Sequence, residues 1–232
     1  MGATVRLIGN EGFHLSAGGM AAYVDAFHGG LPWVAGGPGD PNGPAGADLI
    51  LVTHAHWDHF DQRQVAEAAR LTGACVVGPA SVIARLAGKL PGGQLTELEP
   101  SPARAGRAAA SSANIRGAKV TAFRTRHSRD HNSYLVEMPD LRFFHDGDNE
   151  DTRCLDPAAL RPLDALLIGP WQGSGWVDFV EAVRPKRYFL MHLGEQELDE
   201  HDAGTFLAET CGCSRVPEGL VVLRPGQAYE LA

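Results

Sequence analysis

The stretch that decides the fold is Asp48-Leu49-Ile50-Leu51-Val52-Thr53, which runs directly into His54-Ala55-His56-Trp57-Asp58-His59. The first six residues are a nearly continuous apolar run, which is typical of a strand buried on both faces. Residues 61–70 follow with a helical pattern, in which Asp61 is a candidate N-cap and Gly73 a candidate stop. A buried strand, a polar loop and a helix in this order indicate an α/β fold with functional groups at a strand end.

The loop between that strand and that helix holds three histidines and one aspartate within six residues. Imidazole and carboxylate groups are the usual ligands of zinc and of other divalent first-row metals. Polar side chains crowded at the end of a buried strand are costly unless a partner satisfies them. We therefore predict a metal site here, whereas a single histidine would be read as an ordinary core or surface residue.

The remaining sequence alternates short apolar runs with helical patterns, without a fixed repeat. We predict strands over 4–8, 21–25, 48–53, 74–77, 119–125, 133–138, 141–145, 164–168, 187–191, 220–223 and 228–231. We predict helices over 61–70, 81–86, 176–183 and 203–210. Residues 35–47 read as a loop rich in Gly and Pro, and 90–117 as a loop or a join between two halves. The length of 232 residues fits one domain over 1–232.

Composition narrows the class of protein further. Twenty Lys and Arg against 28 Asp and Glu give a formal charge of −8, which argues against nucleic-acid binding. No run approaches the roughly 20 apolar residues of a membrane helix, and no signal peptide is visible, so we expect a cytoplasmic protein without a membrane partner. The four cysteines, at 75, 154, 211 and 213, are read as ordinary thiols.

At this point the residues point to a known family. His54-x-His56-x-Asp58-His59 resembles the signature of the metallo-β-lactamase superfamily. Three later landmarks occur in the order that this family has, namely Thr125-Arg126-His127-Ser128, Phe143-Phe144-His145-Asp146-Gly147-Asp148 and Phe189-Leu190-Met191-His192. The opening segment 12–26 and the His127-Ser128 pair resemble its lactonase-like branch, typified by ascorbate-6-phosphate lactonase.

The resemblance implies a fold and a set of ligands. The fold would be a four-layer αββα sandwich of two mixed sheets, face to face, with helices outside. Seven residues would hold two divalent ions: His54, His56 and His127 the first, Asp58, His59 and His192 the second, with Asp148 bridging them. Zinc is the first choice, and Mn²⁺ and Fe²⁺ remain alternatives because no cysteine is a ligand.

Two of these assignments have rivals nearby in the sequence. His131 competes with His127, which we prefer because it directly follows the strand. Asp146 competes with Asp148, which we prefer because Gly147 frees the backbone just before it. His145 is read as structural, and Arg129 as the better of the nearby arginines for holding an anionic substrate.

The assembled site predicts hydrolysis. Bound metal lowers the pKa of water from 15.7 to about 7 and so supplies hydroxide at neutral pH. The resemblance implies two catalytic roles: Asp58 would orient the hydroxide or accept its proton, and His192 would tune the second metal. With the bridging hydroxide counted, the centre keeps a net charge of about +1, which could hold an anionic group.

The predicted function is therefore a metal-dependent hydrolase that attacks a carbonyl (lactone or ester) or phosphoryl centre of a small molecule, which could be anionic. The alternatives are a nuclease or phosphodiesterase of the same superfamily, which usually has an added domain or a basic surface, and a non-catalytic binding protein on this fold. A diiron oxygenase of the superfamily is a further alternative, but that branch has Glu where this chain has His56.

Overall fold

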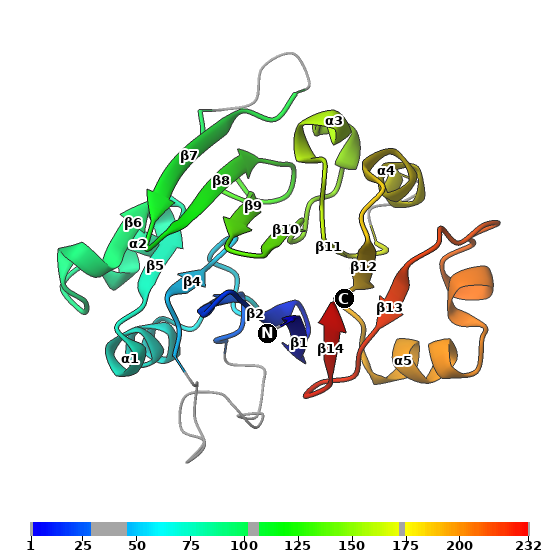
Figure 1. Cartoon of the computed structure of the whole chain (residues 1–232), viewed down its shortest axis with the longest axis horizontal. Helices are drawn as coiled ribbons and strands as arrows, with labels where there is room; N and C mark the ends of the chain where they lie inside the picture. The colour runs from blue at the N-terminus through cyan, green and yellow to red at the C-terminus, as the bar shows by residue number, and fades with distance from the viewer. Residues whose placement is uncertain (1, 29–45, 102–106, 172–174, 232) are drawn as a thin grey trace.

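The computed structural model describes residues 2–28, 46–101, 107–171 and 175–231. Two seven-stranded sheets lie face to face, with helices on their outer sides (Figure 1). Both sheets contain parallel and antiparallel strand pairs. The predicted four-layer αββα sandwich of two mixed sheets is confirmed.

The order of strands across each sheet brings distant parts of the chain together. The first sheet runs β14 (Ala228–Leu231), β1 (Ala3–Gly9), β2 (Gly12–Ala17), β3 (Met20–Val24), β4 (Leu49–Leu51), β5 (Cys75–Gly78) and β6 (Leu95–Glu97). The second runs β13 (Leu220–Val222), β12 (Arg187–Leu190), β11 (Ala165–Ile168), β10 (Leu141–His145), β9 (Asn132–Met138), β8 (Ala118–Arg124) and β7 (Ala110–Ile115). Strands β3, β4 and β5 are parallel, as are β10, β11 and β12, so several chain segments leave each sheet at one edge.

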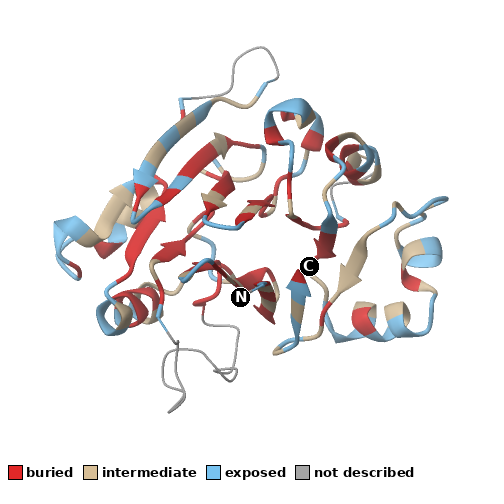
Figure 2. Cartoon of the chain, viewed as in Figure 1, coloured by how far each residue is buried: buried red, intermediate tan, exposed pale blue. Residues whose placement is uncertain are grey.

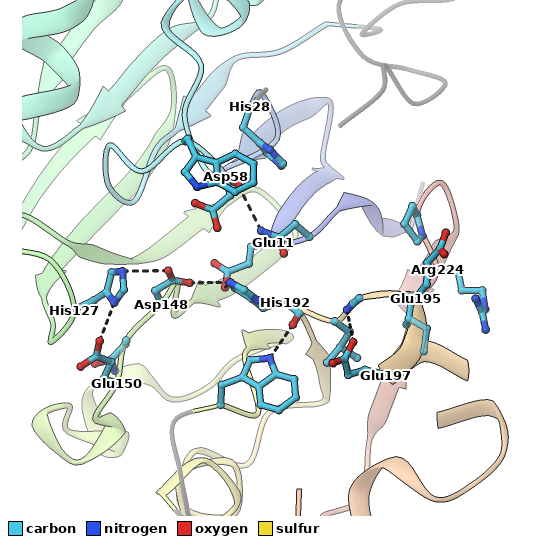
Figure 3. A pocket seen from close by; sticks show the side chains of 18 residues that line it. Glu11, His28, Asp58, His127, Asp148, Glu150, His192, Glu195, Glu197 and Arg224 are labelled. Carbon is cyan, nitrogen blue, oxygen red and sulfur yellow. Dashed lines mark hydrogen bonds and ion pairs between the residues drawn. The ribbon is translucent and has the colours of Figure 1, made fainter. Parts of the chain in front are cut away.

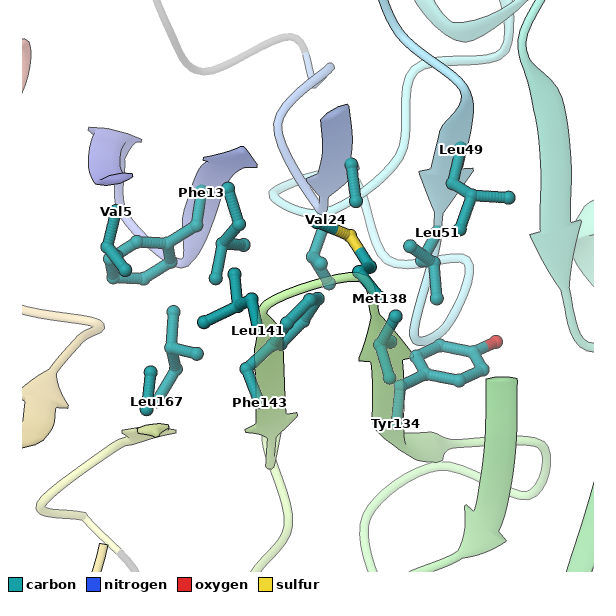
Figure 4. Close-up of a cluster of buried hydrophobic side chains, with 14 of the residues drawn as sticks. Val5, Phe13, Val24, Leu49, Leu51, Tyr134, Met138, Leu141, Phe143 and Leu167 are labelled. Atoms are coloured by element: carbon teal, nitrogen blue, oxygen red, sulfur yellow. The ribbon is translucent and has the colours of Figure 1, made fainter. Parts of the chain in front are cut away.

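The main hydrophobic core lies between the two sheets (Figure 4). Val24 and Leu51 from the first sheet and Phe143 and Leu167 from the second are all fully buried in it. Because alternate residues of a strand point to opposite faces, one set of side chains fills this layer and the other set meets the helices. Figure 2 shows the result as a buried interior with exposed outer faces on the helices.

Helices cover the outer face of each sheet. Helices α1 (Gln62–Thr72) and α2 (Ala80–Leu86) pack on the first sheet, and α3 (Pro157–Leu160) and α4 (Gly175–Val183) on the second. The predicted start and stop of α1 are confirmed: the Asp61 side chain accepts from the backbone N–H groups of residues 63 and 64, and Gly73 has φ +74°. No helix of the described residues is long and apolar enough to cross a membrane.

The structure adds to the sequence prediction in two places. The connection after the first predicted strand contains a further strand, β2, and the segment 90–117 contains β6 and β7. The two last predicted strands both exist but belong to different sheets, because β14 pairs with β1 and β13 pairs with β12.

One predicted helix is wrong. The helix near the carboxyl end is α5 (Glu195–Asp202), and only the five residues Phe206–Thr210 of the predicted 203–210 helix are helical, with wide π-type hydrogen bonding. Gly204 takes φ +80° and separates the two segments. Part of the predicted loop 35–47 lies outside the described residues. The four cysteines are free thiols, as expected.

Candidate metal centre

Two clusters of metal-ligating side chains lie next to each other and share one carboxylate. The first contains His54, His56, His127 and Asp148, and the second contains Glu11, His59, Asp148 and His192. Within each cluster, one donor atom per residue lies within 4.8 Å of every other. The sharing of Asp148 is the geometry expected of two neighbouring metal ions bridged by one aspartate.

These side chains come from five chain segments that end beside one another. The histidines of the signature loop follow β4, while His127 follows β8, Asp148 follows β10 and His192 follows β12. Glu11 lies in the turn between β1 and β2. The backbone N–H of His192 donates to the carbonyl oxygen of Asn10 at 3.1 Å, which ties the last segment to that turn.

The shared aspartate is held by a buried histidine. His131 accepts from the backbone N–H of Asp148 through Nε2 at 3.0 Å, and its Nδ1 donates to the Thr125 hydroxyl at 2.8 Å. Both ring nitrogens are therefore used, so neither is free for a metal ion. Gly147 has φ +58°, and a Cβ there would lie 2.5 Å from His131 Nε2. This close approach requires glycine.

The rival aspartate has a different role in the structure. Asp146 is buried, and its carboxylate accepts from the Ser133 hydroxyl and the Asn149 amide. Burial raises the pKa of Asp146 to about 7, although those two hydrogen bonds oppose the shift. Among the described residues, the clusters contain His127 and Asp148 but neither His131 nor Asp146.

A buried aspartate that the sequence analysis did not single out orients the signature histidines. Asp25 follows β3 and accepts from His59 Nδ1 at 2.9 Å, from the Thr53 hydroxyl and from the Thr53 backbone N–H. His54 Nδ1 in turn donates to the Thr53 hydroxyl oxygen at 3.0 Å. The Nδ1 atoms of both imidazoles are thus engaged away from the clusters, and the Nε2 atoms face them.

The donor atoms fit a cation. Among the described residues, His54 Nε2, His59 Nε2 and Glu11 Oε2 are buried without a hydrogen-bond partner. Buried polar atoms normally have a partner, and a metal ion satisfies such atoms. Burial lowers the pKa of His54 to about 2, with His59 as a further cause, so this imidazole is neutral and ready to bind metal.

Negative charge accumulates around His59. Burial lowers its pKa, but Glu11, Asp148 and Asp25 outweigh burial and raise it to about 12. Burial raises the pKa of Glu11 well above 4.5, against the attraction of His59. Three acidic side chains therefore surround one imidazole. A divalent cation bound at this place would balance their negative charge better than a proton on His59 does.

Glu11 was missed by the sequence analysis. Its side chain is 1% exposed, and its Oε1 lies 3.9 Å from His192 Nε2. The Glu11 backbone oxygen accepts from His145 Nε2 at 2.9 Å, so His145 is structural, as expected. The only signal in the sequence was an acidic residue in a turn, where a solvated side chain is the usual outcome.

Asp58 lies beside the second cluster rather than inside it. Its Oδ2 is 3.9 Å from His59 Nε2, its side chain is 25% exposed, and it lines a cavity. The tight second cluster contains Glu11 in its place. The structure thus brings six of the seven predicted ligands into the clusters and leaves Asp58 at their edge.

A cavity of about 1130 Å³ opens onto the clusters (Figure 3). His127 and Glu150 lie at one end, and Glu195, Glu197 and Arg224 at the other. The cavity is also lined by Trp57, Trp171, His28 and three apolar residues near the carboxyl end, Leu193, Leu198 and Pro225. Arg129, the sequence candidate for substrate binding, is not among the lining residues.

His28 is a further lining residue that the sequence analysis did not single out. It is 2% exposed and lines the cavity, and both of its ring nitrogens lack a hydrogen-bond partner among the described residues. Burial lowers its pKa, so the ring is neutral at pH 7. A neutral imidazole at this place could donate to or accept from a bound molecule.

Comparison with known proteins agrees with this geometry. The family model of the β-lactamase superfamily domain matches residues 22–193, which include every cluster residue except Glu11. The chain belongs to the metallo-β-lactamase superfamily. Within that superfamily it is a metal-dependent hydrolase, and the coarser part of the functional prediction is confirmed.

Relatives of similar length support the assignment. A UPF0173 metal-dependent hydrolase of Thermococcus onnurineus is 25% identical over 246 residues, covering 98% of this chain and 99% of its own. One from Aeropyrum pernix is 29% identical over 255 residues, covering 98% and 97%. Among solved structures, the metallo hydrolase Igni18 of Ignicoccus hospitalis has a TM-score of 0.64 at 17% identity and full coverage of both chains, which shows a shared fold.

Proposed function

We propose that the protein hydrolyses a lactone or ester bond of a small molecule, as a lactonase-like member of its superfamily with two zinc ions. The observation that supports this most is the carboxylate of Asp148, which two clusters share. Among the described residues, the Nε2 atoms of His54 and His59 have no hydrogen-bond partner, and each atom belongs to one of these clusters. Two neighbouring divalent ions supply hydroxide at neutral pH and stabilise the negative charge that develops on the attacked group.

In this proposal each metal has its own histidines. His54, His56 and His127 would hold the first ion, His59 and His192 the second, and Asp148 would contribute to both. Glu11 would add a buried carboxylate to the second ion, since its Oε2 has no hydrogen-bond partner among the described residues. Mn²⁺ or Fe²⁺ would fit the same nitrogen and oxygen donors.

Asp58 has two compatible roles. Its carboxylate lies 3.9 Å from His59 Nε2, near enough to complete the second metal site as the family signature implies. It also lines the cavity and is partly exposed, so it can orient the attacking water or accept its proton. We propose Asp58 as the catalytic carboxylate and His192 as a ligand that would tune the second metal.

The surroundings of the centre favour a carbonyl over a phosphoryl substrate. Arg224 is the only Lys or Arg among the described residues that line the cavity, and it is paired with Asp199 and Asp202, each at 2.7 Å. Sites that bind phosphate groups usually present arginine or lysine to them. We therefore place lactones and esters before phosphodiesters as candidate substrates.

Metal analysis combined with a substrate panel tests the proposal. We expect about two zinc ions per chain and hydrolysis of lactones or aryl esters. Activity should be lost in His56→Ala and Asp58→Ala, while circular dichroism shows an intact fold. Activity on RNA or DNA alone would support a nuclease, and full metal occupancy without turnover of any substrate would support a binding protein; either result would refute the proposal.

A further inference from the structure

The rim of the cavity is acidic. Glu150, Glu195 and Glu197 line it, and Glu150 is 68% exposed in its side chain although its Oε1 accepts from His127 Nδ1 at 3.0 Å. Arg224 cannot offset these charges, because its guanidinium is already paired with two aspartates. Figure 3 shows the carboxylates at both ends of the cavity, so a bound molecule meets negative charge on either side of the centre.

The metal centre of the proposed function would have no net positive charge once Glu11 is counted. Two divalent ions would bring four positive charges, while Glu11, Asp58, Asp148 and one hydroxide would bring four negative charges. The imidazoles are neutral when they bind metal. The acidic rim therefore decides the sign of the potential that a substrate experiences on entering.

Two exposed indole rings are part of the apolar lining of the cavity. Trp57 is 72% exposed and Trp171 is 47% exposed, two of the four large hydrophobic residues that are exposed in the described part of the chain. Trp171 is held in place, because its Nε1 donates to the carbonyl oxygen of His192 at 2.7 Å and its ring contacts Phe206 edge-on. Exposed indoles next to a reactive centre are suited to substrate contact, and tryptophan is the best partner for a cation over a ring face.

We propose that the cleft selects substrates whose non-reacting part is apolar and cationic, such as a substituted ammonium group, bound against Trp57 and Trp171. The carboxylates of the rim attract the positive charge, and the indole faces bind it as it loses water. A negatively charged acyl or phosphate group is disfavoured by the same carboxylates. This inference rests on the proposed function only for the identity of the bond that is hydrolysed; the binding preference is argued separately.

Binding of three small probes to the zinc-loaded protein tests the charge preference without turnover. The probes are phenyltrimethylammonium, benzyl alcohol and benzenesulfonate, measured by titration calorimetry at low ionic strength. We expect the cation to bind about tenfold more tightly than the neutral probe, given the combined pull of ring faces and carboxylates. Benzenesulfonate should bind least, and the advantage of the cation should shrink at high salt.

Variants show whether the named residues are responsible. Trp57→Ala and Trp171→Ala should each weaken binding of the cation several-fold, and Glu195→Gln should weaken it while sparing benzyl alcohol. Leu71→Ala and Glu67→Gln are matched controls on α1, where both side chains are exposed and do not line the cavity. Both variants should bind all three probes with native affinity.

The outcomes separate this inference from the proposed function. Equal or tighter binding of benzenesulfonate, or unchanged binding of the cation in both tryptophan variants, overturns the charge and aromatic preference. Hydrolysis of esters without such a preference leaves the proposed function standing. Selective binding of the cation without hydrolysis of any ester refutes only the proposed function.

Discussion

Asp25→Asn is the substitution that most directly tests how the chain prepares its metal ligands. In the native structure the Asp25 carboxylate accepts from His59 Nδ1 and, through the Thr53 hydroxyl, also fixes His54. In the variant, the amide oxygen is needed by the Thr53 backbone N–H, which donates to Oδ1 at 2.8 Å. The amide NH₂ then faces His59 Nδ1, which must become an acceptor and move its proton to Nε2, the atom that faces the metal cluster.

The size of the effect follows from these contacts. Loss of a carboxylate partner behind a metal-binding histidine typically weakens metal binding by about 10- to 100-fold, or roughly 1.4–2.7 kcal/mol. His59 contacts Asp25 directly, so we expect the upper part of this range for the second ion. His54 is connected only through Thr53, so we expect the lower part for the first ion. The opposite amide orientation does not avoid the loss, because it sets two buried N–H groups against each other.

Competition with a chromophoric chelator at pH 7 measures both affinities, and atomic emission gives the stoichiometry. Asn suits the backbone at this position, where φ is +47°, about as well as Asp does, so the fold should persist. Asp48→Asn is the matched control: this carboxylate accepts from the Ala21 backbone N–H on the same strand pair, away from both clusters. Two ions bound with native affinity by Asp25→Asn would show that the imidazole tautomers are set in another way.

Three further substitutions probe separate parts of the structure. Glu11→Gln should weaken one of the two ions by at least about tenfold in the same competition assay, and unchanged stoichiometry at limiting zinc would exclude Glu11 as a ligand. Gly147→Ala should destabilise the protein by about 1–2 kcal/mol and lower Tm by a few degrees in calorimetry, because a Cβ meets His131 and the φ of +58° suits only glycine well; an unchanged Tm would refute this. Burial lowers the pKa of His14 to about 4, so the unfolded chain binds a proton near pH 6.5 that the folded chain refuses, and stability falls with falling pH between these values. Urea unfolding should therefore show that lowering the pH from 7 to 5 costs the native protein about 2 kcal/mol more than it costs His14→Gln, and equal losses would contradict the shift.

The sequence alone was sufficient for those parts of the fold that depend on neighbours in the chain. The apolar run 48–53 predicts a buried strand, which lies between helices and the second sheet. The next helix begins after Asp61, whose side chain accepts hydrogen bonds from the first turn, and ends at Gly73, which has a positive φ. The prediction of a helix over 203–210 was wrong for a reason that is also local. Gly204, with φ +80°, stops the chain from continuing as a helix, and it was read as part of the helical pattern.

The candidate residues that stand in a dense local pattern are the ones that the sequence could single out. His54, His56 and His59 stand within one loop, and three such imidazoles have few explanations besides a metal. Choosing His127 over His131 depended on which of them directly follows the strand, and the structure places His131 behind Asp148 instead. Its burial depends on the loop after β10, which no local pattern reveals.

Glu11 and Asp25 could not be found in this way, because their roles depend on pairing between distant segments. Asp25 meets Thr53 because β3 and β4 are parallel neighbours, with the Asp25 N–H donating to the Leu51 carbonyl. Glu11 meets His192 because the turn between β1 and β2 is hydrogen-bonded to the end of β12, about 180 residues away along the chain. An acidic residue directly after a buried strand was the one available signal for Asp25.

The missed glutamate changes what the cleft is expected to bind. With two aspartates counted, the hydrolytic centre keeps one positive charge, and an anionic substrate is a reasonable expectation. The buried carboxylate of Glu11 removes that charge, and the nearest candidate counter-ion in the cavity, Arg224, is already paired. The attraction for an anion would then have to come from the rim. Among the described lining residues, however, the charged side chains there without an arginine or lysine partner are carboxylates. Probe binding to Glu11→Gln at saturating zinc, with both ions bound, therefore bears on both arguments. If Glu11 neutralises the centre, its loss should narrow the difference in affinity between phenyltrimethylammonium and benzenesulfonate. An unchanged difference would mean that the rim alone sets the preference.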